Sequence, residues 1–137
     1  TPNNPRTGTS QFLVATNAGS GFFVTVNGTT PTSGNNVIPP MSSQAPSSPG
    51  QSQFGMNLRA NSNPGIGSDP VGAGTGVISA VYNTPNLFRF NSGDVVVSSP
   101  TTSTDRKFTV SYVVNINSSQ EPGIYNTTLL YTALASF

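Results

Sequence analysis

Apolar and polar residues alternate along the last thirty positions of the chain. Over 108–117 the apolar side chains fall on one face of an extended backbone, at Phe108, Val110, Tyr112, Val114 and Ile116. A period of two is typical of a β-strand with one buried face. Turn-forming residues interrupt the pattern at 118–123, and alternation resumes over 124–137. The stretch therefore predicts a terminal β-hairpin, which needs a second layer of sheet to cover it.

The upstream chain contains several shorter segments that could form this second layer. β-Branched and aromatic residues bounded by turn signals predict strands at 11–16, 22–26, 53–60, 77–82, 86–90 and 94–98. We expect 11–26 to form a hairpin, because only a short turn separates its two strands. The Pro-, Gly- and Ser-rich tracts 29–52 and 61–76 predict long loops. About eight strands without a helix predict an all-β fold, either a β-sandwich or a jelly-roll-like arrangement.

The length of the chain, 137 residues, favours one domain. We expect a single β-sandwich domain over 11–137, preceded by a flexible N-terminal leader at 1–10, which is polar and broken by prolines. No apolar run reaches the ~20 residues that span a bilayer, so no membrane span is expected. The chain begins at Thr1, and we expect a mature, exported form from which a signal segment has been removed.

Charged residues are scarce, at 7% of the chain compared with ~25% in an average soluble domain. Hydroxyl and amide side chains replace them, which is compatible with an all-β scaffold carrying polar loops. The net charge of +1 offers no electrostatic footprint for nucleic acid. Only Arg106 and Lys107 are adjacent cations, and two charges at a strand entrance indicate solvated ends rather than a binding site. No nucleic-acid partner is expected.

Residues that carry catalysis are almost missing from the sequence. There is no His and no Cys, and the four acids lie in separate polar segments, at Asp69, Asp94, Asp105 and Glu121. A glycosidase would need two converging carboxylates, and nothing in their spacing predicts that. We therefore expect a protein that is not an enzyme, with no catalytic residues, no metal site and no cofactor.

Two further features concern single residues. Asn-x-Ser/Thr sequons make Asn27, Asn117 and Asn126 possible glycosylation sites, although such sequons arise easily by chance in this composition. Tyr125 follows Pro122 and Gly123 at a strand entrance. There its hydroxyl could tie the turn to the strand, as in a tyrosine corner.

The terminal segment from Glu121 (EPGIYNTTLLYTA) resembles the last strand of secreted bacterial and fimbrial β-sandwich subunits. Three further segments, QFGMNLRAN from Gln53, NLFRFNSGD from Asn86 and FTVSYVVNI from Phe108, are similar to Saccharibacteria-type surface proteins. Those proteins share an Ala-Thr-Asn-Ala-x-x-Gly-Phe pattern, which is found here from Ala15 to Phe22. The resemblance covers most of the chain and implies an exported, non-enzymatic protein of the cell surface, but it assigns no functional residue.

These observations lead to the hypothesis of an extracellular structural subunit that polymerises with copies of itself into a pilus-like surface filament. In one version an N-terminal strand is donated to the next subunit, with Phe12, Leu13, Val14 and Ala15 as the contact residues. An equally weighted alternative is that 11–16 pairs within its own domain. Two other functions remain open, namely a cell-surface adhesin or carbohydrate-binding module that uses loops 29–52 and 61–76, and a viral or phage coat or decoration protein.

Overall fold

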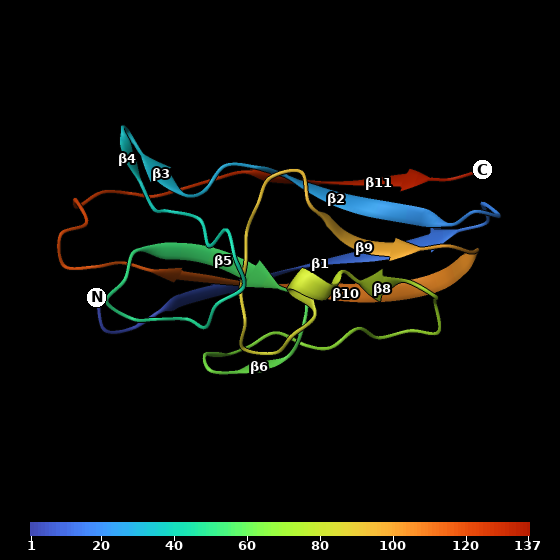
Figure 1. The fold of residues 1–137 in the computed structure, drawn as a ribbon, viewed down its shortest axis with the longest axis horizontal. Helices are drawn as coiled ribbons and strands as arrows, with labels where there is room; N and C mark the ends of the chain where they lie inside the picture. The colour runs from blue at the N-terminus through green and yellow to red at the C-terminus, as the bar shows by residue number, and fades with distance from the viewer.

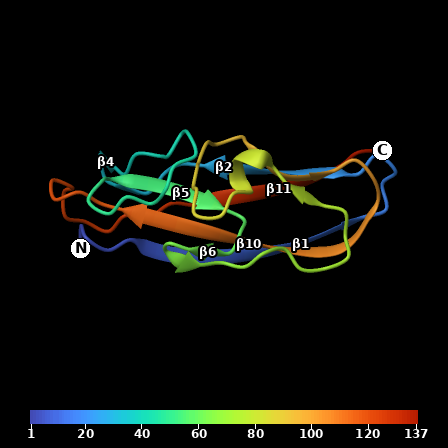
Figure 2. The same ribbon diagram turned by 60° about the horizontal axis from the view of Figure 1, so that its bottom comes forward.

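The computed structural model describes all residues from 1 to 137, and it contains two antiparallel β-sheets packed face to face (Figures 1 and 2). Sheet A has the strand order β1 (Arg6–Thr16), β10 (Ser103–Asn115), β5 (Gln53–Asn57). Sheet B has the order β11 (Leu129–Ala135), β2 (Phe22–Gly28), β9 (Val95–Ser99), β8 (Val77–Ile78). The remaining elements are short: β3 (Thr32–Ser33), β4 (Asn36–Val37), β6 (Asn61–Ser62), β7 (Gly65–Ile66) and the 3-10 helix η1 (Ala80–Tyr82). The predicted all-β sandwich is confirmed.

The core lies between the two sheets. It is built from every second residue of each strand, the residues whose side chains face inward. Its fully buried side chains come from both layers, with Met56, Phe108 and Val110 in sheet A and Val24 and Val97 in sheet B. Burial of such side chains contributes about 1.5–3 kcal/mol each, which drives the two sheets together. A smaller apolar cluster of Met41, Phe88 and Val113 lies on the opposite face of sheet A.

The terminal hairpin predicted for 108–137 is wrong, although both of its strands exist. β10 pairs with β1 and β5 in sheet A, whereas β11 pairs with β2 in sheet B. The connection between them, 116–128, crosses from one sheet to the other at one end of the sandwich (Figure 1). Alternation reports that one face is buried, but it carries no information about which strand is the neighbour.

The hairpin predicted for 11–26 is also wrong, for a similar reason. β1 belongs to sheet A and β2 to sheet B, and the turn at 17–21 passes between the layers. Ala18 in this turn is buried. β1 moreover begins at Arg6, so the second half of the expected leader is part of a strand.

The two tracts predicted as loops, 29–52 and 61–76, pack closely against the sheets. The first contains β3 and β4 and buries Ile38 and Met41. The second contains β6 and β7 and pairs Val71 with Lys107 of β10. Residues 86–90 form isolated bridges to β5 and to Ala45 rather than a strand, and only Val77–Ile78 of 77–82 is extended, because η1 follows.

Candidate functional site

One long side of the sandwich is open. β1 is an edge strand of sheet A and β11 is an edge strand of sheet B, and the two run in the same direction along this side (Figure 1). Between them lies a groove with a volume of about 540 Å³, lined by β1, by β11 and the residues before it, and by β10. We call this the β1–β11 groove. It is the candidate functional site.

Small residues on β1 create the groove. The residues of β1 that face sheet B are Gly8, Ser10, Phe12 and Val14, which alternate with residues facing outward. Phe12 and Val14 fill the space between the sheets, but Gly8 and Ser10 do not. A Cβ atom on Gly8 would meet no atom within 4 Å. As a result, every residue of β1 from Arg6 to Gln11 is exposed, including those that face inward.

A chain of hydroxyl groups crosses the floor of the groove. Ser10 Oγ lies 2.8 Å from the Tyr112 hydroxyl, which lies 2.6 Å from the Tyr131 hydroxyl. The Tyr131 hydroxyl also donates to Met56 Sδ at 3.5 Å. Burial raises the pKa of Tyr131 far above its usual range, and the neighbouring Tyr112 adds to this effect. Tyr131 is therefore a neutral phenol at physiological pH, and the chain joins β1 and β10 to β11 without any charge.

The backbone of β1 presents free hydrogen-bonding groups along its outer edge. Lys107 exchanges both of its backbone hydrogen bonds with Val71, at 2.7 and 3.0 Å, on the side of β10 away from β1. Its partner Leu13 on β1 is therefore in a non-hydrogen-bonded pair, and the backbone groups of Leu13 point away from the sheet. By the same alternation, the groups of Thr7, Thr9 and Gln11 also point outward.

β11 has an equivalent free edge. Val26 on β2 uses its backbone groups toward β9, donating to Asp94 at 3.0 Å and accepting from Gly93 at 2.7 Å. Tyr131, which is paired with Val26, therefore directs its own backbone groups outward, and the alternation extends this to Leu129 and Ala133. Two rows of unpaired backbone groups thus border the groove.

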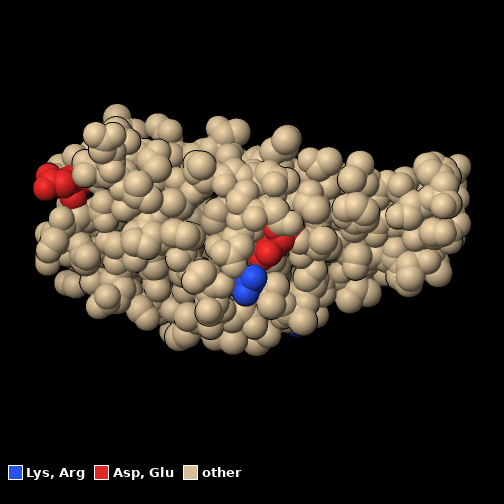
Figure 3. Space-filling model, turned by 45° about the horizontal axis from the view of Figure 1, so that its top comes forward, with Lys and Arg blue, Asp and Glu red and all other residues tan.

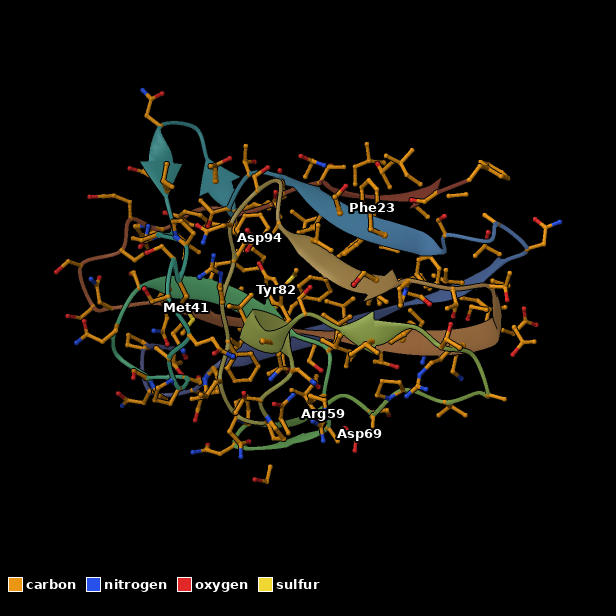
Figure 4. All side chains as sticks on the ribbon, turned by 45° about the vertical axis from the view of Figure 1, so that its right-hand side comes forward. Phe23, Met41, Arg59, Asp69, Tyr82 and Asp94 are labelled. Atoms are coloured by element: carbon orange, nitrogen blue, oxygen red, sulfur yellow. The ribbon has the colours of Figure 1, made fainter.

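The opposite side of the sandwich is closed by a polar contact. Tyr82 of η1 donates a 2.5 Å hydrogen bond to Asp94 Oδ2, and Arg89 Nε donates to the same oxygen at 3.1 Å. Figure 4 shows Tyr82 and Asp94 next to each other beside β9. Burial, followed by the contact with Asp94, raises the pKa of Tyr82 above its usual range. The hydrogen bond to Asp94 raises the pKa of Arg89. The two long sides of the molecule therefore differ. The side of β5 and β8 is held by this contact and carries a smaller pocket beside β8, whereas the side of β1 and β11 carries a groove between two free edges.

The end of the groove before β11 is held by the tyrosine predicted to act as a corner. The Tyr125 hydroxyl donates to the carbonyl oxygen of Glu121 at 2.8 Å and accepts from Gln120 Nε2 at 2.8 Å. This confirms the expected role of Tyr125. Asn126 exchanges backbone hydrogen bonds with Thr32 at 3.0 and 3.1 Å, which fixes the wall of the groove to β3.

The four residues proposed as an intersubunit contact all lie in β1, which pairs with β10 of the same chain. Phe12 stacks between Phe108 and Tyr131, with ring centroids 5.5 and 5.7 Å away. Val14 is buried in the core, whereas Leu13 and Ala15 are exposed on the outer face. In the single chain this segment therefore occupies its own sheet, which is the alternative that the sequence left open.

Of the three sequon asparagines, two are exposed. Asn27 at the end of β2 and Asn126 before β11 are exposed. Asn117 is half-buried, and its side-chain oxygen accepts a hydrogen bond from the backbone of Ser119 at 3.0 Å.

The acidic residues do not converge. Asp69 pairs with Arg59 at 2.8 Å and accepts from the backbone N–H of Ala60 at 3.0 Å (Figure 4). The hydrogen bond from Arg59, with the one from Ala60, holds the pKa of Asp69 below its usual value. No three His, Cys, Asp or Glu residues are grouped so that they could hold a metal ion.

Sequence reasoning misses the groove. The sequence pattern places Gly8 and Ser10 in a flexible leader, and Tyr112 and Tyr131 at ordinary core positions. The sequence does contain one signal for the groove. Two inward-facing positions carry tyrosine rather than phenylalanine, and a buried tyrosine hydroxyl usually needs a hydrogen-bond partner.

The structure contains no helix with the length and apolar character needed to cross a bilayer. No family model, curated protein or solved structure matches the chain.

Proposed function

We propose that this chain is a non-enzymatic, extracellular structural subunit that assembles with copies of itself into a pilus-like surface filament. The observation that supports this proposal is the open side of the sandwich, where two free strand edges border a groove whose only charged lining residue is Arg6.

A free edge of this kind favours pairing with another chain. Soluble β-proteins usually protect their edges with short strands, prolines, bulges or inward-pointing charges. β1 is 11 residues long and contains no proline. Its one irregularity lies near its end, between Val14 and Thr16, and its one charged residue, Arg6, is its first, so the edge from Thr7 to Leu13 has none of these protections. The edge is a template onto which a further strand could add, and in a structural subunit this addition serves assembly.

The distribution of charge supports assembly as well. None of the four strands of sheet B contains a charged residue. On the face that Figure 3 displays, charged side chains occupy only one end and one central spot. Copies of the chain could approach through such a surface without like-charge repulsion. An extracellular location is in keeping with this low charge, with the accessible sequons at Asn27 and Asn126, and with the resemblance to exported surface proteins.

Two modes of assembly involve β1. In strand exchange, β1 leaves β10 of its own chain and pairs with β10 of the next subunit, as the donor-strand hypothesis requires. In edge addition, β1 stays in place and uses its outward-facing backbone groups. Strand exchange requires the pairing of β1 with β10 of the same chain to break, whereas edge addition requires it to remain.

An engineered disulfide separates these modes. Gln11 and Thr109 are a non-hydrogen-bonded pair of β1 and β10, and their side chains are in contact, with Gln11 Nε2 at 3.3 Å from Thr109 Oγ1. The Cα atoms of such pairs are ~4.5 Å apart, within the range that a disulfide spans. Because the chain has no cysteine, Gln11→Cys/Thr109→Cys would contain one possible intramolecular disulfide.

The test compares the wild-type chain with the oxidised and reduced double variant by electron microscopy and light scattering. Filaments of the wild-type chain are the expected result. Filaments of the oxidised variant would identify edge addition, whereas filaments only after reduction would identify strand exchange. Dispersed monomers or closed shells of the wild-type chain, at concentrations where surface subunits polymerise, would overturn the proposal.

A second candidate function, a carbohydrate-binding adhesin, is favoured by one observation. Aromatic rings line the groove, at Phe12, Tyr112, Tyr125 and Tyr131, and sugars commonly stack on such rings. Loops 29–52 and 61–76, the contact surface expected for such a module, contain no tyrosine or tryptophan. Saturable binding of an oligosaccharide by a monomeric chain, lost in Tyr125→Ala, would support this alternative.

A further inference from the structure

We infer that β1 joins two copies of the chain by antiparallel edge pairing, with Ser10 of one copy opposite Ser10 of the other. This inference rests on the proposed self-assembly and names the surface and register of one of its contacts.

The register of the outward-facing backbone groups supports this pairing. With Ser10 on the two-fold axis, Thr7 lies opposite Leu13 of the second copy, and Thr9 lies opposite Gln11. These four residues are the ones whose N–H and C=O groups point outward. Each of them would then exchange both backbone hydrogen bonds with an outward-facing residue of the other copy. The register uses β1 from Arg6 to Val14, nearly its full length.

The inward-facing side chains of the two copies also fit together. In the same register Gly8 of each copy lies opposite Phe12 of the other, so the two-fold axis produces two equivalent Gly8–Phe12 pairs. The position of Gly8 is open, since a Cβ atom there would have no neighbour within 4 Å, whereas Phe12 is the large residue that narrows the groove. A small residue beside a large one lets neighbouring strands pack without a void. The inward-facing side chains of β1 on one side of Ser10 thus fit those on the other side when two copies pair.

The charge of β1 favours the antiparallel direction over the parallel one. Arg6 is the only charged residue of β1. Antiparallel pairing places it opposite Val14, and the two Arg6 side chains are then about 27 Å apart, at ~3.4 Å per residue. Parallel pairing in register would place like charges directly opposite each other, which is destabilising.

The contact also closes the groove. β11 runs in the same direction as β1 on the same side of the molecule, so the second copy covers both free edges (Figure 2). The hydroxyl chain of Ser10, Tyr112 and Tyr131 would then be shielded from water. A two-fold contact ends after two copies, so the dimer would be the repeating unit of the filament, and a different surface would join the dimers.

Single cysteines test the register directly. Residues that face each other on a non-hydrogen-bonded pair are close enough for a disulfide, and Ser10 occupies such a position on the axis. In a chain without native cysteine, Ser10→Cys should give covalent dimers under mild oxidation. Gly8→Cys is the matched control, because position 8 of each copy lies opposite Phe12 and far from position 8 of the other. We expect cross-linking of Ser10→Cys to be at least about tenfold faster, the ratio that 1.4 kcal/mol of preference gives.

Proline provides an independent test that needs no cysteine. Thr9→Pro removes an outward N–H while leaving the hydrogen bonds to β10 intact, and edge strands accept proline at such positions. Thr9→Val keeps the N–H and is the control. By sedimentation, Thr9→Pro should weaken dimerisation by about tenfold or more, and Thr9→Val should not. Thermal melts of both variants verify that they are folded.

The outcomes distinguish this inference from the proposed function. Filaments in the wild-type chain, with equal cross-linking of both cysteine variants and no effect of Thr9→Pro, would overturn the β1 contact alone. A wild-type chain that stays monomeric would overturn both proposals. Saturable oligosaccharide binding in the groove by such a monomer would assign the groove to a glycan instead.

Discussion

The hydroxyl groups of Tyr112 and Tyr131 lie 2.6 Å apart and connect the centre of sheet A to the edge of sheet B. β11 pairs with no strand except β2, so its position relative to sheet A depends on this bond and on the stacking of Phe12 against Tyr131. The pair therefore helps to hold β11 against sheet A across the floor of the groove. Ser10 extends the same chain to the free edge, which couples the groove floor to the proposed contact.

A double-mutant cycle on the two tyrosines should reveal this coupling. Tyr131→Phe leaves the Tyr112 hydroxyl without its cross-sheet partner and should cost about 1 kcal/mol of unfolding free energy. Tyr112→Phe should cost a similar amount. The double variant should lose less than the sum of the two, because the second substitution removes a group that no longer has a partner. Urea denaturation measures all four proteins, and strictly additive losses would argue against the bond.

The protein should lose stability in alkaline solution. Burial raises the pKa of both Tyr82 and Tyr131 above the usual value near 10. Below about pH 10 the folded and the unfolded chain both keep the hydroxyl protons of these tyrosines, so the free energy of unfolding does not depend on their ionisation. Above it, the unfolded chain releases protons that the folded chain retains, so unfolding becomes more favourable as pH rises. Each tyrosine should add a slope of up to about 1.4 kcal/mol per pH unit.

Variants of the same tyrosines provide the check. In Tyr82→Phe and Tyr131→Phe the dependence of the denaturation midpoint on pH above about 10 should flatten, since one ionisable group is missing in each. Phenolate absorbance followed through the transition should rise with unfolding. The chain has four tyrosines, so the wild-type protein is compared with each variant. A rise in absorbance of the folded protein that becomes smaller in Tyr82→Phe or Tyr131→Phe would contradict the burial of that hydroxyl.

The two ion pairs of the molecule should differ in their effect on stability. Asp94→Ala would leave the buried Tyr82 hydroxyl without an acceptor and should cost about 2–3 kcal/mol. Asp69→Ala breaks an exposed pair, screened by solvent, and should cost about 1 kcal/mol at most. Thermal or urea denaturation of both variants measures the difference. Equal losses would mean that the contact of Tyr82 and Asp94 does not hold the closed side of the sandwich.

The fold class could be predicted from sequence, but the pairing of strands could not. Alternation locates β2, β5 and β9 to within three residues, because one face of each is buried. It also finds β10 from Phe108 onward, but misses the first five residues of that strand, which begins at Ser103. The same alternation fits any neighbour, so the expected hairpins at 11–26 and 108–137 are wrong. In both cases the connecting segment crosses between sheets, and such a crossing depends on the packing of the whole chain rather than on local turn chemistry.

The groove is beyond sequence reasoning for a related reason. In the sequence, Gly8 and Ser10 belong to a polar N-terminal segment. Their role in the groove depends on their pairing with Tyr112 and Val110 of β10. Tyr125 is predictable because its partner Glu121 is only four positions away. Contacts between residues that are close in sequence could be predicted. Contacts between β1 and β10, which are about a hundred residues apart, could not.

Two glycines at positive φ give a matched test of the turn between β1 and β2. Gly21 has a φ of 80° and Gly50 a φ of 91°, so alanine is strained at both. They differ in surroundings, since a Cβ on Gly21 would overlap the carbonyl oxygen of Ser99, whereas one on Gly50 would meet nothing within 4 Å. Gly50→Ala should therefore cost about 1 kcal/mol, from backbone conformation alone.

Gly21→Ala should cost well above about 3 kcal/mol, because the Ser99 backbone must also shift and Ser99 is paired with Phe22 in sheet B. Urea denaturation and circular dichroism of the two variants measure the difference. The result bears on assembly too, because exchange of β1 between subunits requires the turn at 17–21 to open as a hinge. A loss as small as that of Gly50→Ala would show that this turn rearranges easily, and strand exchange would then be favoured over edge addition.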